Sequence, residues 1–121
     1  MNFINNNVTG NYSNGVLLYI YGSNNTNIIF KDNNIAGLDS GVDLNASNLK
    51  NANIFIFNNN ITGNSTDLMI VSNNATFGNL YLQNNTINST SASSSAINLI
   101  FLVVQLEELE LILLLALRLT M

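Results

Sequence analysis

The sequence predicts an all-β fold, a right-handed parallel β-helix in which about 26 residues and three short strands form each coil. The first observation is a six-residue frame that returns four times, at residues 3–8, 30–35, 56–61 and 82–87. Its second Asn falls at Asn6, Asn33, Asn59 and Asn85, so the spacing of the frame is nearly constant. A fixed period of roughly 20 to 50 residues indicates a solenoid. The second observation is that apolar residues within each run lie two apart, which is strand periodicity.

Stacking the chain at this period, with one extra residue near Asn11, aligns apolar columns that we expect to face a shared interior. Strands stacked in this way must run parallel, and their connections are overwhelmingly right-handed. The columns are Val16, Val42 and Leu68; Leu18, Leu44 and Ile70; Ile28, Ile54 and Leu80; Phe30, Ile56 and Leu82; and Val8, Ile35, Ile61 and Ile87.

Polar residues align as well. Asn and Gly tolerate positive φ, so their columns are predicted to form the corners between strands. Stacked Asn amides can also hydrogen-bond along a column, which gives these residues a structural role. The predicted columns are Asn6, Asn33, Asn59 and Asn85; Asn27, Asn53 and Asn79; Asn5, Asp32, Asn58 and Asn84; and Gly10, Gly37 and Gly63.

The frame φ-x-N-N-x-[IV]-[TA]-G, in a chain rich in Asn, Ser and Thr, resembles right-handed parallel β-helix repeat proteins over about residues 1–100. It is similar in particular to the adhesin-like surface proteins of methanogenic archaea, and more loosely to bacterial polymorphic outer-membrane repeats. The resemblance implies a location at the cell surface or outside the cell, and a role in adhesion. Those proteins are long and carry a signal peptide, and this sequence shows neither property.

Composition argues against several classes of function. Asn occupies 26 positions while Lys and Arg together occupy 3, so no nucleic-acid surface is expected. The absence of Cys argues against disulfides and zinc–thiolate sites. The absence of His removes the commonest general base and metal ligand. We therefore expect no catalytic residue, no metal and no cofactor.

The β-helix fold also hosts carbohydrate-active enzymes, which need clustered carboxylates. Before the tail the acids are Asp32, Asp39, Asp43 and Asp67. Asp32 stands in a corner column as a substitute for Asn. Asp43 and Asp67 could approach each other as a weak Ca²⁺ site, but solvated turn acids are the simpler interpretation. The enzyme alternative is accordingly a poor one.

Two other features allow a binding role. The tyrosines Tyr12, Tyr19, Tyr21 and Tyr81 could form a platform that stacks on sugars. Tyr19 and Tyr21 share one strand face, whereas Tyr81 belongs to a different strand; exposed aromatic packing is the alternative. Nine Asn-x-Ser/Thr sequons could mark a glycosylated exterior, or could follow from Asn corners that precede β-branched residues. The sequons begin at Asn7, Asn11, Asn24, Asn45, Asn60, Asn64, Asn74, Asn84 and Asn88.

The composition changes abruptly near residue 100, so we divide the chain into β-helix coils at 1–100 and a Leu-rich tail at 101–121. Leu, Glu, Ala and Arg favour helix, and the tail is predicted to be helical. The stretch 97–119 is long enough to span a bilayer, but Glu107, Glu108 and Glu110 near its centre make spanning costly. The tail could instead cap the end of the rod, or be frame-shifted sequence.

The sequence therefore predicts a non-catalytic, adhesin-like cell-surface repeat module or a fragment of one. Surface glycans or other β-helix coils are the expected partners. The chain starts inside the first frame without a basic and apolar leader, so we expect a fragment and find no signal peptide. The alternatives are a gene remnant without independent function and, less well supported, a carbohydrate-active β-helix enzyme.

Overall fold

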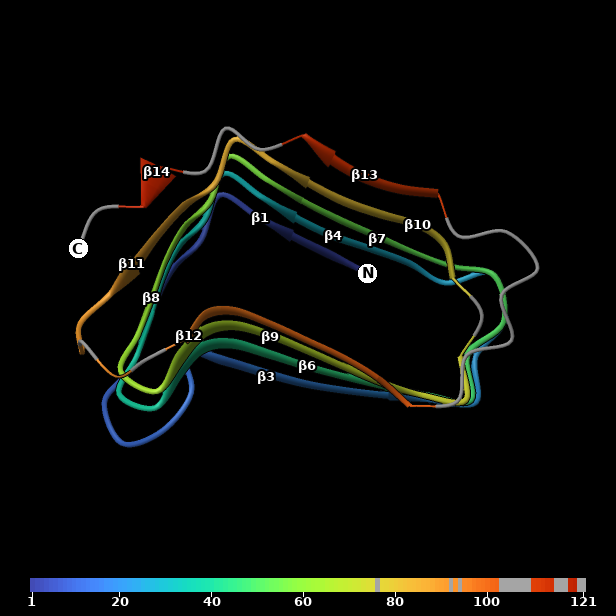
Figure 1. The fold of residues 1–121 in the computed structure, drawn as a ribbon, viewed down its shortest axis with the longest axis horizontal. Coiled ribbons are helices and arrows are strands. Elements are labelled where there is room, and N and C mark those ends of the chain that lie inside the picture. The colour runs from blue at the N-terminus through green and yellow to red at the C-terminus, as the bar shows by residue number, and fades with distance from the viewer. Residues whose placement is uncertain (76, 92, 94, 103–109, 115–117, 120–121) are drawn as a thin grey trace.

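The computed structural model describes residues 1–121 except 76, 92, 94, 103–109, 115–117 and 120–121. It is a parallel β-solenoid in which each coil contributes one strand to each of three sheets, as Figure 1 shows. The predicted all-β fold, with about 26 residues and three strands per coil, is confirmed.

Sheet A holds β1 (Asn2–Ile4), β4 (Asn27–Lys31), β7 (Ala52–Phe57), β10 (Phe77–Gln83) and β13 (Glu110–Leu114). Sheet B holds β2 (Asn7–Gly10), β5 (Asn34–Gly37), β8 (Asn60–Gly63), β11 (Thr86–Ser89) and β14 (Arg118–Leu119). Sheet C holds β3 (Val16–Tyr21), β6 (Ser40–Ser47), β9 (Thr66–Asn73) and β12 (Ser95–Leu102).

All strand pairs in the described part of the chain are parallel, and their register reproduces the apolar columns expected from the sequence. Ile28 pairs with Ile54, which pairs with Leu80. The extra residue of the first coil lies in the loop between β2 and β3, which also carries the exposed Tyr12. A substitution at one position of a coil therefore alters the packing against the paired residues of the preceding and the following coil.

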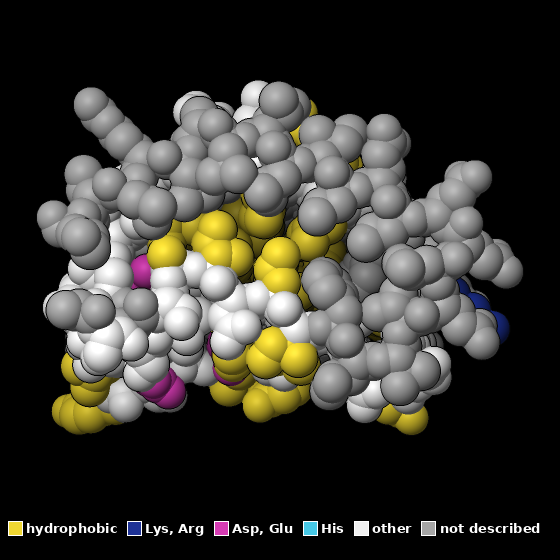
Figure 2. Space-filling view, in the orientation of Figure 1, with side chains coloured by type: hydrophobic (Ala, Val, Ile, Leu, Met, Phe, Trp, Pro, Cys, Tyr) yellow, Lys and Arg dark blue, Asp and Glu magenta, His cyan; other side chains and the backbone are white. Residues whose placement is uncertain are grey.

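The core is the stack of inward side chains between the three sheets. Phe30, Leu44, Ile56 and Leu68 have no exposed surface. Phe3 and Phe30 stack with ring centroids 5.1 Å apart and an angle of 13° between the ring planes. Figure 2 shows hydrophobic side chains in the middle of this face and along its lower edge, next to polar side chains, with few charged ones. Burial of these apolar columns is the main force that holds the coils together.

The predicted glycine column ends the strands of sheet B, but the reason for glycine differs from the prediction. Gly37 has no positive φ. A Cβ atom at Gly37 would collide with the backbone carbonyl of Ser40. Glycine is needed here because two backbone segments approach closely where the chain passes from sheet B to sheet C.

The predicted helical tail is wrong where the structure describes it, because β13 and β14 are strands. β13 pairs with β10 in parallel, with Glu110 beside Asn79. An open strand edge offers backbone partners along its whole length, and such tertiary pairing overrides the helix propensity of Leu and Glu. The rest of the predicted tail lies outside the described residues. In the described part of the chain no helix has the length and apolar character to cross a membrane.

The core predicts a sharp contrast between inward and outward apolar side chains. Ile56→Ala removes a fully buried side chain and should lower the free energy of unfolding by about 2–5 kcal/mol. Leu17→Ala, at a side chain that is 49% exposed, is the matched control and should cost about 1 kcal/mol or less. Urea unfolding followed by circular dichroism measures both values. Equal losses would contradict the assignment of inward and outward faces.

Candidate functional site: the asparagine corner and the outer face of sheet A

A buried ladder of amides runs along the corner between sheets A and B. The backbone N–H and Nδ2 of Asn33 donate to Oδ1 of Asn59 at 3.0 and 2.8 Å. The same two groups of Asn59 donate to Oδ1 of Asn85 at 2.9 and 3.0 Å. Asn6 begins the ladder by donating to Oδ1 of Asn33 at 2.9 and 3.0 Å. Each step therefore links one coil to the next through a pair of hydrogen bonds.

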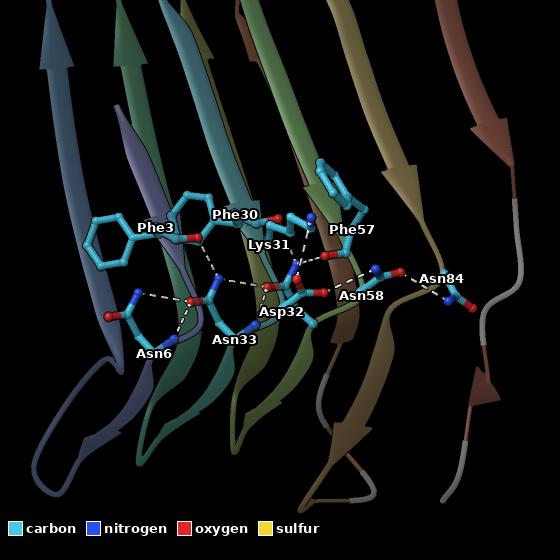
Figure 3. Close-up of polar contacts among 10 residues, drawn as sticks. Phe3, Asn6, Phe30, Lys31, Asp32, Asn33, Phe57, Asn58 and Asn84 are labelled. Carbon is cyan, nitrogen blue, oxygen red and sulfur yellow. Dashed lines mark hydrogen bonds and ion pairs between the residues drawn. The ribbon is translucent and has the colours of Figure 1, made fainter.

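The ladder also ties the side chains to the backbone of the preceding coil. Nδ2 of Asn33 donates to the carbonyl of Phe3 at 2.8 Å, and Nδ2 of Asn59 donates to that of Phe30 at 3.0 Å (Figure 3). In these two residues both amide hydrogens and both oxygen lone pairs are used, which is the full capacity of an Asn side chain. Complete satisfaction explains how Asn33 and Asn59, 3% and 2% exposed, can be buried without penalty.

Two exposed rows of amides flank this ladder. In the outer row beside sheet A, Nδ2 of Asn84 donates to Asn58 at 3.0 Å, and Nδ2 of Asn58 donates to Asp32 at 3.1 Å. In the row beside sheet B, Asn60 donates to Asn34 at 2.8 Å. These exposed rows donate from the later coil to the earlier one, opposite to the buried ladder.

The outer row forms the turn itself. Asn5, Asp32, Asn58 and Asn84 have φ between 55° and 57°, so this predicted corner column does adopt positive φ. Asp32 occupies the Asn position as expected from the sequence, and accepts a hydrogen bond where an Asn would. Its carboxylate also lies 3.7 Å from Nζ of Lys31. The corner thus combines backbone geometry and side-chain stacking in the same residues.

An open groove follows this corner along the solenoid axis. It lies between the two exposed rows and over the buried ladder, and is lined by Asn, Asp and Thr side chains. The lining residues are Asn5, Asn6, Asn7, Asp32, Asn33, Asn34, Asn58, Asn59, Asn60, Asn84 and Thr86. Such a surface offers hydrogen-bond donors and acceptors at the repeat of the coils, which is about 4.7–4.9 Å in a β-sheet.

The third predicted column, Asn27, Asn53 and Asn79, was expected at a corner and instead lies within the strands of sheet A. The turns before these strands use other residues with positive φ, namely Gly22, Asn25, Asn48, Asn51 and Asn74. The column still stacks, since Asn53 donates to Asn27 at 2.9 Å and Asn79 donates to Asn53 at 2.8 Å. It forms an amide row on the outer face of sheet A.

An aromatic cluster lies next to this amide row and was not predicted as a candidate site. Phe55 follows Asn53 by two residues and therefore faces outward on the same strand. Its ring centroid is 6.4 Å from that of Tyr81 in the next coil. Nζ of Lys31 lies 5.7 Å from the ring centroid of Phe57, in the following outward row. Alternation with Ile54 and Ile56, which point inward, is the sequence signal that could have identified both phenylalanines.

The tyrosines predicted as a possible platform lie on two sheets. Tyr19 and Tyr21 project from β3 in sheet C and are 72% and 78% exposed. Tyr81 belongs to β10 in sheet A and joins Phe55 instead. The structure therefore does not bring the three tyrosines together.

The acidic residues that the structure describes do not form a cluster of metal ligands. In the described part of the chain no group of three or more His, Cys, Asp or Glu residues could hold a metal ion. Asp43 accepts hydrogen bonds from Asn45 at 2.7 Å and from Asn14 at 3.4 Å. Burial raises the pKa of Asp43, and the negative charge of Asp39 adds to the rise, while the two amide bonds oppose it.

Asp67 is fully buried beside the close turn after β8. Its Oδ1 accepts from the backbone N–H of Gly63 at 2.6 Å, and its Oδ2 has no hydrogen-bond partner among the described residues. Desolvation raises the pKa of Asp67, and the hydrogen bond from Gly63 only partly opposes this. Ionisation of this buried carboxyl group at high pH is therefore expected to destabilise the fold.

Most of the sequons are accessible. Seven of the nine acceptor side chains are exposed, and those of Asn45 and Asn88 are half-buried. Several of the exposed ones, including Asn60 and Asn84, already donate along a ladder. The placement is therefore compatible with both interpretations, since the ladder itself requires Asn at these positions.

Comparison with known proteins finds no match to a family model, to a curated protein or to a solved structure.

The buried ladder predicts that Asn59 and its neighbour Asn60 differ strongly in their contribution to stability. Asn59→Leu leaves the N–H and Nδ2 of Asn33 and the carbonyl of Phe30 without their partner in the core. The free energy of unfolding should fall by on the order of 3 kcal/mol. Asn60→Leu breaks only exposed bonds and should cost about 1 kcal/mol or less. Urea titration compares the two variants, and an equal loss would contradict a structural role for the buried ladder.

Asp67 predicts a pH dependence of stability. Its pKa is higher in the folded than in the unfolded chain, so its contribution to stability is fully present below the unfolded pKa of about 3.9 and is lost as pH rises through the folded pKa. Asp67→Asn cannot ionise and should be more stable than the parent at pH 7, with a flatter profile above pH 4. Thermal midpoints across this range test the expectation. Asp32→Asn, which removes an exposed charge, is the control; a profile unchanged by Asp67→Asn would refute it.

Proposed function

We propose that this chain is a non-catalytic, adhesin-like cell-surface repeat module that binds extended glycans on the outer face of sheet A. The observation that supports the proposal is the parallel alignment of an amide row with an aromatic pair on that face. Asn27, Asn53 and Asn79 form the row, and Phe55 and Tyr81 lie two residues farther along their strands.

The chemistry of this face suits a neutral polysaccharide. A sugar ring has an apolar face that can cover the rings of Phe55 and Tyr81, and hydroxyl groups that both donate and accept. An Asn amide inside a row uses one hydrogen and one lone pair on its neighbours, which leaves another of each for a ligand. Since the row repeats once per coil, a chain lying along the solenoid axis could use the same contacts in successive coils.

The groove at the corner between sheets A and B extends this surface with further amides. Among the described residues that line it, one side chain is acidic, that of Asp32, which already pairs with Lys31 and accepts from Asn58. Glycoside cleavage by the common mechanisms requires two carboxyl groups on either side of the bond. The makeup of the lining therefore favours binding over hydrolysis.

The resemblance of the repeating frame to adhesin-like surface proteins of methanogenic archaea suggests the same kind of role and a location at the cell surface. A mechanical reason supports it as well. A rod made of stacked coils has a long surface relative to its core, and repeat proteins use such surfaces to bind extended partners.

The proposal predicts that binding depends on the outer face of sheet A. Using an immobilised panel of neutral and charged polysaccharides, we expect saturable binding of the full chain to at least one neutral glycan. Phe55→Ala and Tyr81→Ala should each weaken that binding by about fivefold or more, because each removes an aromatic contact. Tyr19→Ala, on sheet C, is the matched control and should bind as the parent does.

Thermal midpoints of the three variants separate lost binding from lost folding. Failure of the parent to bind any glycan would contradict the proposed ligand and would favour the gene-remnant alternative. Release of reducing ends or unsaturated sugars by the purified chain would contradict the non-catalytic assignment.

A further inference from the structure

The connection between β2 and β3 is longer than its counterparts in the coils that follow. It comprises residues 11–15, whereas residues 38–39 join β5 to β6 and residues 64–65 join β8 to β9. The longer connection projects beyond the stacked corners of those coils, as the blue loop in Figure 1 shows. Because it carries the extra residue of the first coil, its tip stands outside the repeated columns that build the fold.

The base of this loop is fixed to the second coil. The N–H of Leu38 donates to the carbonyl of Gly10 at 3.0 Å. The N–H of Gly15 donates to the carbonyl of Ser40 at 2.9 Å, and Oδ1 of Asn14 accepts from the N–H of Ser40 at 3.3 Å. The loop is therefore a protrusion on an anchored base.

The tip of the loop is the sequon Asn11-Tyr12-Ser13, in which all three residues are exposed. Tyr12 is 94% exposed. The amide of Asn11 and the hydroxyl of Ser13 make no hydrogen bond to any residue that the structure describes. The amide that accepts a glycan and the hydroxyl that completes the sequon thus both face solvent. Asn60 and Asn84, in contrast, donate along amide rows that the fold uses.

The other eight sequons lie in the regular coils and are less accessible. In that of Asn7, the middle residue Val8 packs against the core. In those of Asn24, Asn64 and Asn88, at least one of the three residues is half-buried. In the remaining four the middle residue is buried, namely Ala46, Ile61, Ala75 and Asn85. Exposure of the whole sequon therefore distinguishes Asn11 within the described part of the chain.

Strand pairing separates the two kinds of sequon further. An enzyme that modifies an Asn must enclose the neighbouring residues in its own cleft. Asn60 begins β8, which pairs with β5 on one side and β11 on the other, so this segment can leave the sheet only by local opening. Asn11 and Tyr12 belong to no strand, and the carbonyl of Ser13 accepts from the N–H of Asp39 at 3.0 Å. The loop can therefore enter a cleft while the coils stay intact.

From this exposure we propose that Asn11 is the acceptor of an N-linked glycan in the folded chain. A transferase joins Nδ2 of Asn11 to C1 of an oligosaccharide that is carried on a lipid phosphate. The bond between C1 and the phosphate oxygen breaks, the lipid phosphate leaves, and Nδ2 gives up one of its two protons to a base. The proposal rests on the surface location proposed above, because the chain meets such a transferase during export.

The glycan would lie away from the surface proposed to bind polysaccharide. Asn11 is at the corner between sheets B and C, where β2 ends and β3 begins. Sheet B and sheet C each separate this corner from sheet A along the coil (Figure 1). Modification of Asn11 therefore leaves the outer face of sheet A open.

The test uses the folded full chain and a purified oligosaccharyltransferase that glycosylates two matched free peptides, residues 8–14 and 57–63. Each peptide has one sequon, with Asn11 or Asn60 at its centre. Mass spectrometry measures the rate of modification at each site. Relative to its free peptide, Asn11 in the folded chain should react about tenfold or more faster than Asn60, because opening of β8 costs free energy.

Two substitutions locate the site. Ser13→Ala removes the hydroxyl of the sequon and should abolish modification of Asn11, whereas Ser13→Thr keeps a hydroxyl and should retain it. Both change an exposed side chain, so the thermal midpoints should stay close to that of the parent.

Equal relative rates at Asn11 and Asn60 would overturn the proposal, because the fold would then not select the loop. An unmodified Asn11 in the folded chain would overturn it as well, and so would modification that survives Ser13→Ala. Each result is independent of export, since the transferase is supplied. Each is also independent of the polysaccharide panel, which tests the outer face of sheet A.

Discussion

The structure depends on the buried amide ladder at the corner between sheets A and B. Apolar columns alone do not fix how one coil lies on the next, because hydrophobic burial is non-directional. The double donation from one Asn to the Oδ1 of the next has a defined geometry, and it ties each corner to the carbonyl of the preceding coil. A shift in register would leave several buried polar groups without partners, at about 1–3 kcal/mol for each. The ladder thus sets the register of each coil on the next, which apolar burial alone does not determine.

The opposed directions of the buried and exposed amide rows have a further consequence. Each row gives the solenoid a polarity, so its two ends differ chemically even where the strands look alike. Because the buried row donates toward later coils and the exposed rows donate toward earlier ones, each face of a coil presents acceptors at some corner positions and donors at others. A coil stacked in the same direction and register pairs every one of these groups, whereas a shift of one residue would leave some of them unpaired.

Much of this fold was predictable from the sequence because identical columns demand a repeating environment. The period of the frame fixed the strand register to the residue in the regular coils, and Asn5, Asn58 and Asn84 were correctly placed at corners with positive φ. Period alone could not say which of several Asn columns turns the chain. Asn27 and Asn53 lie within strands, where their amides stack on the sheet face. Amides at a corner stack in the same way, so both placements produce the same column of repeated Asn in the sequence. The tail was mispredicted for a related reason, since helix propensity says nothing about an open edge such as that of β10.

The outer surface was harder to predict than the core. Inward positions are constrained by packing, whereas outward positions are set by solvent or by a partner, and a single sequence does not distinguish these. Phe55 and Phe57 were not predicted as a site because each stands beside an inward Ile in an apolar run, although alternation with Ile54 and Ile56 already places both on the outer face. Tyr19 and Tyr21 were proposed as a platform because they share one strand face, but they have no aromatic neighbour at the paired positions of the next coil, where β6 presents Asn45 and Ser47. Repetition across coils, rather than exposure in one coil, is therefore the better guide to a binding face in a solenoid. By that criterion the amide and aromatic rows of sheet A stand above the tyrosines of sheet C.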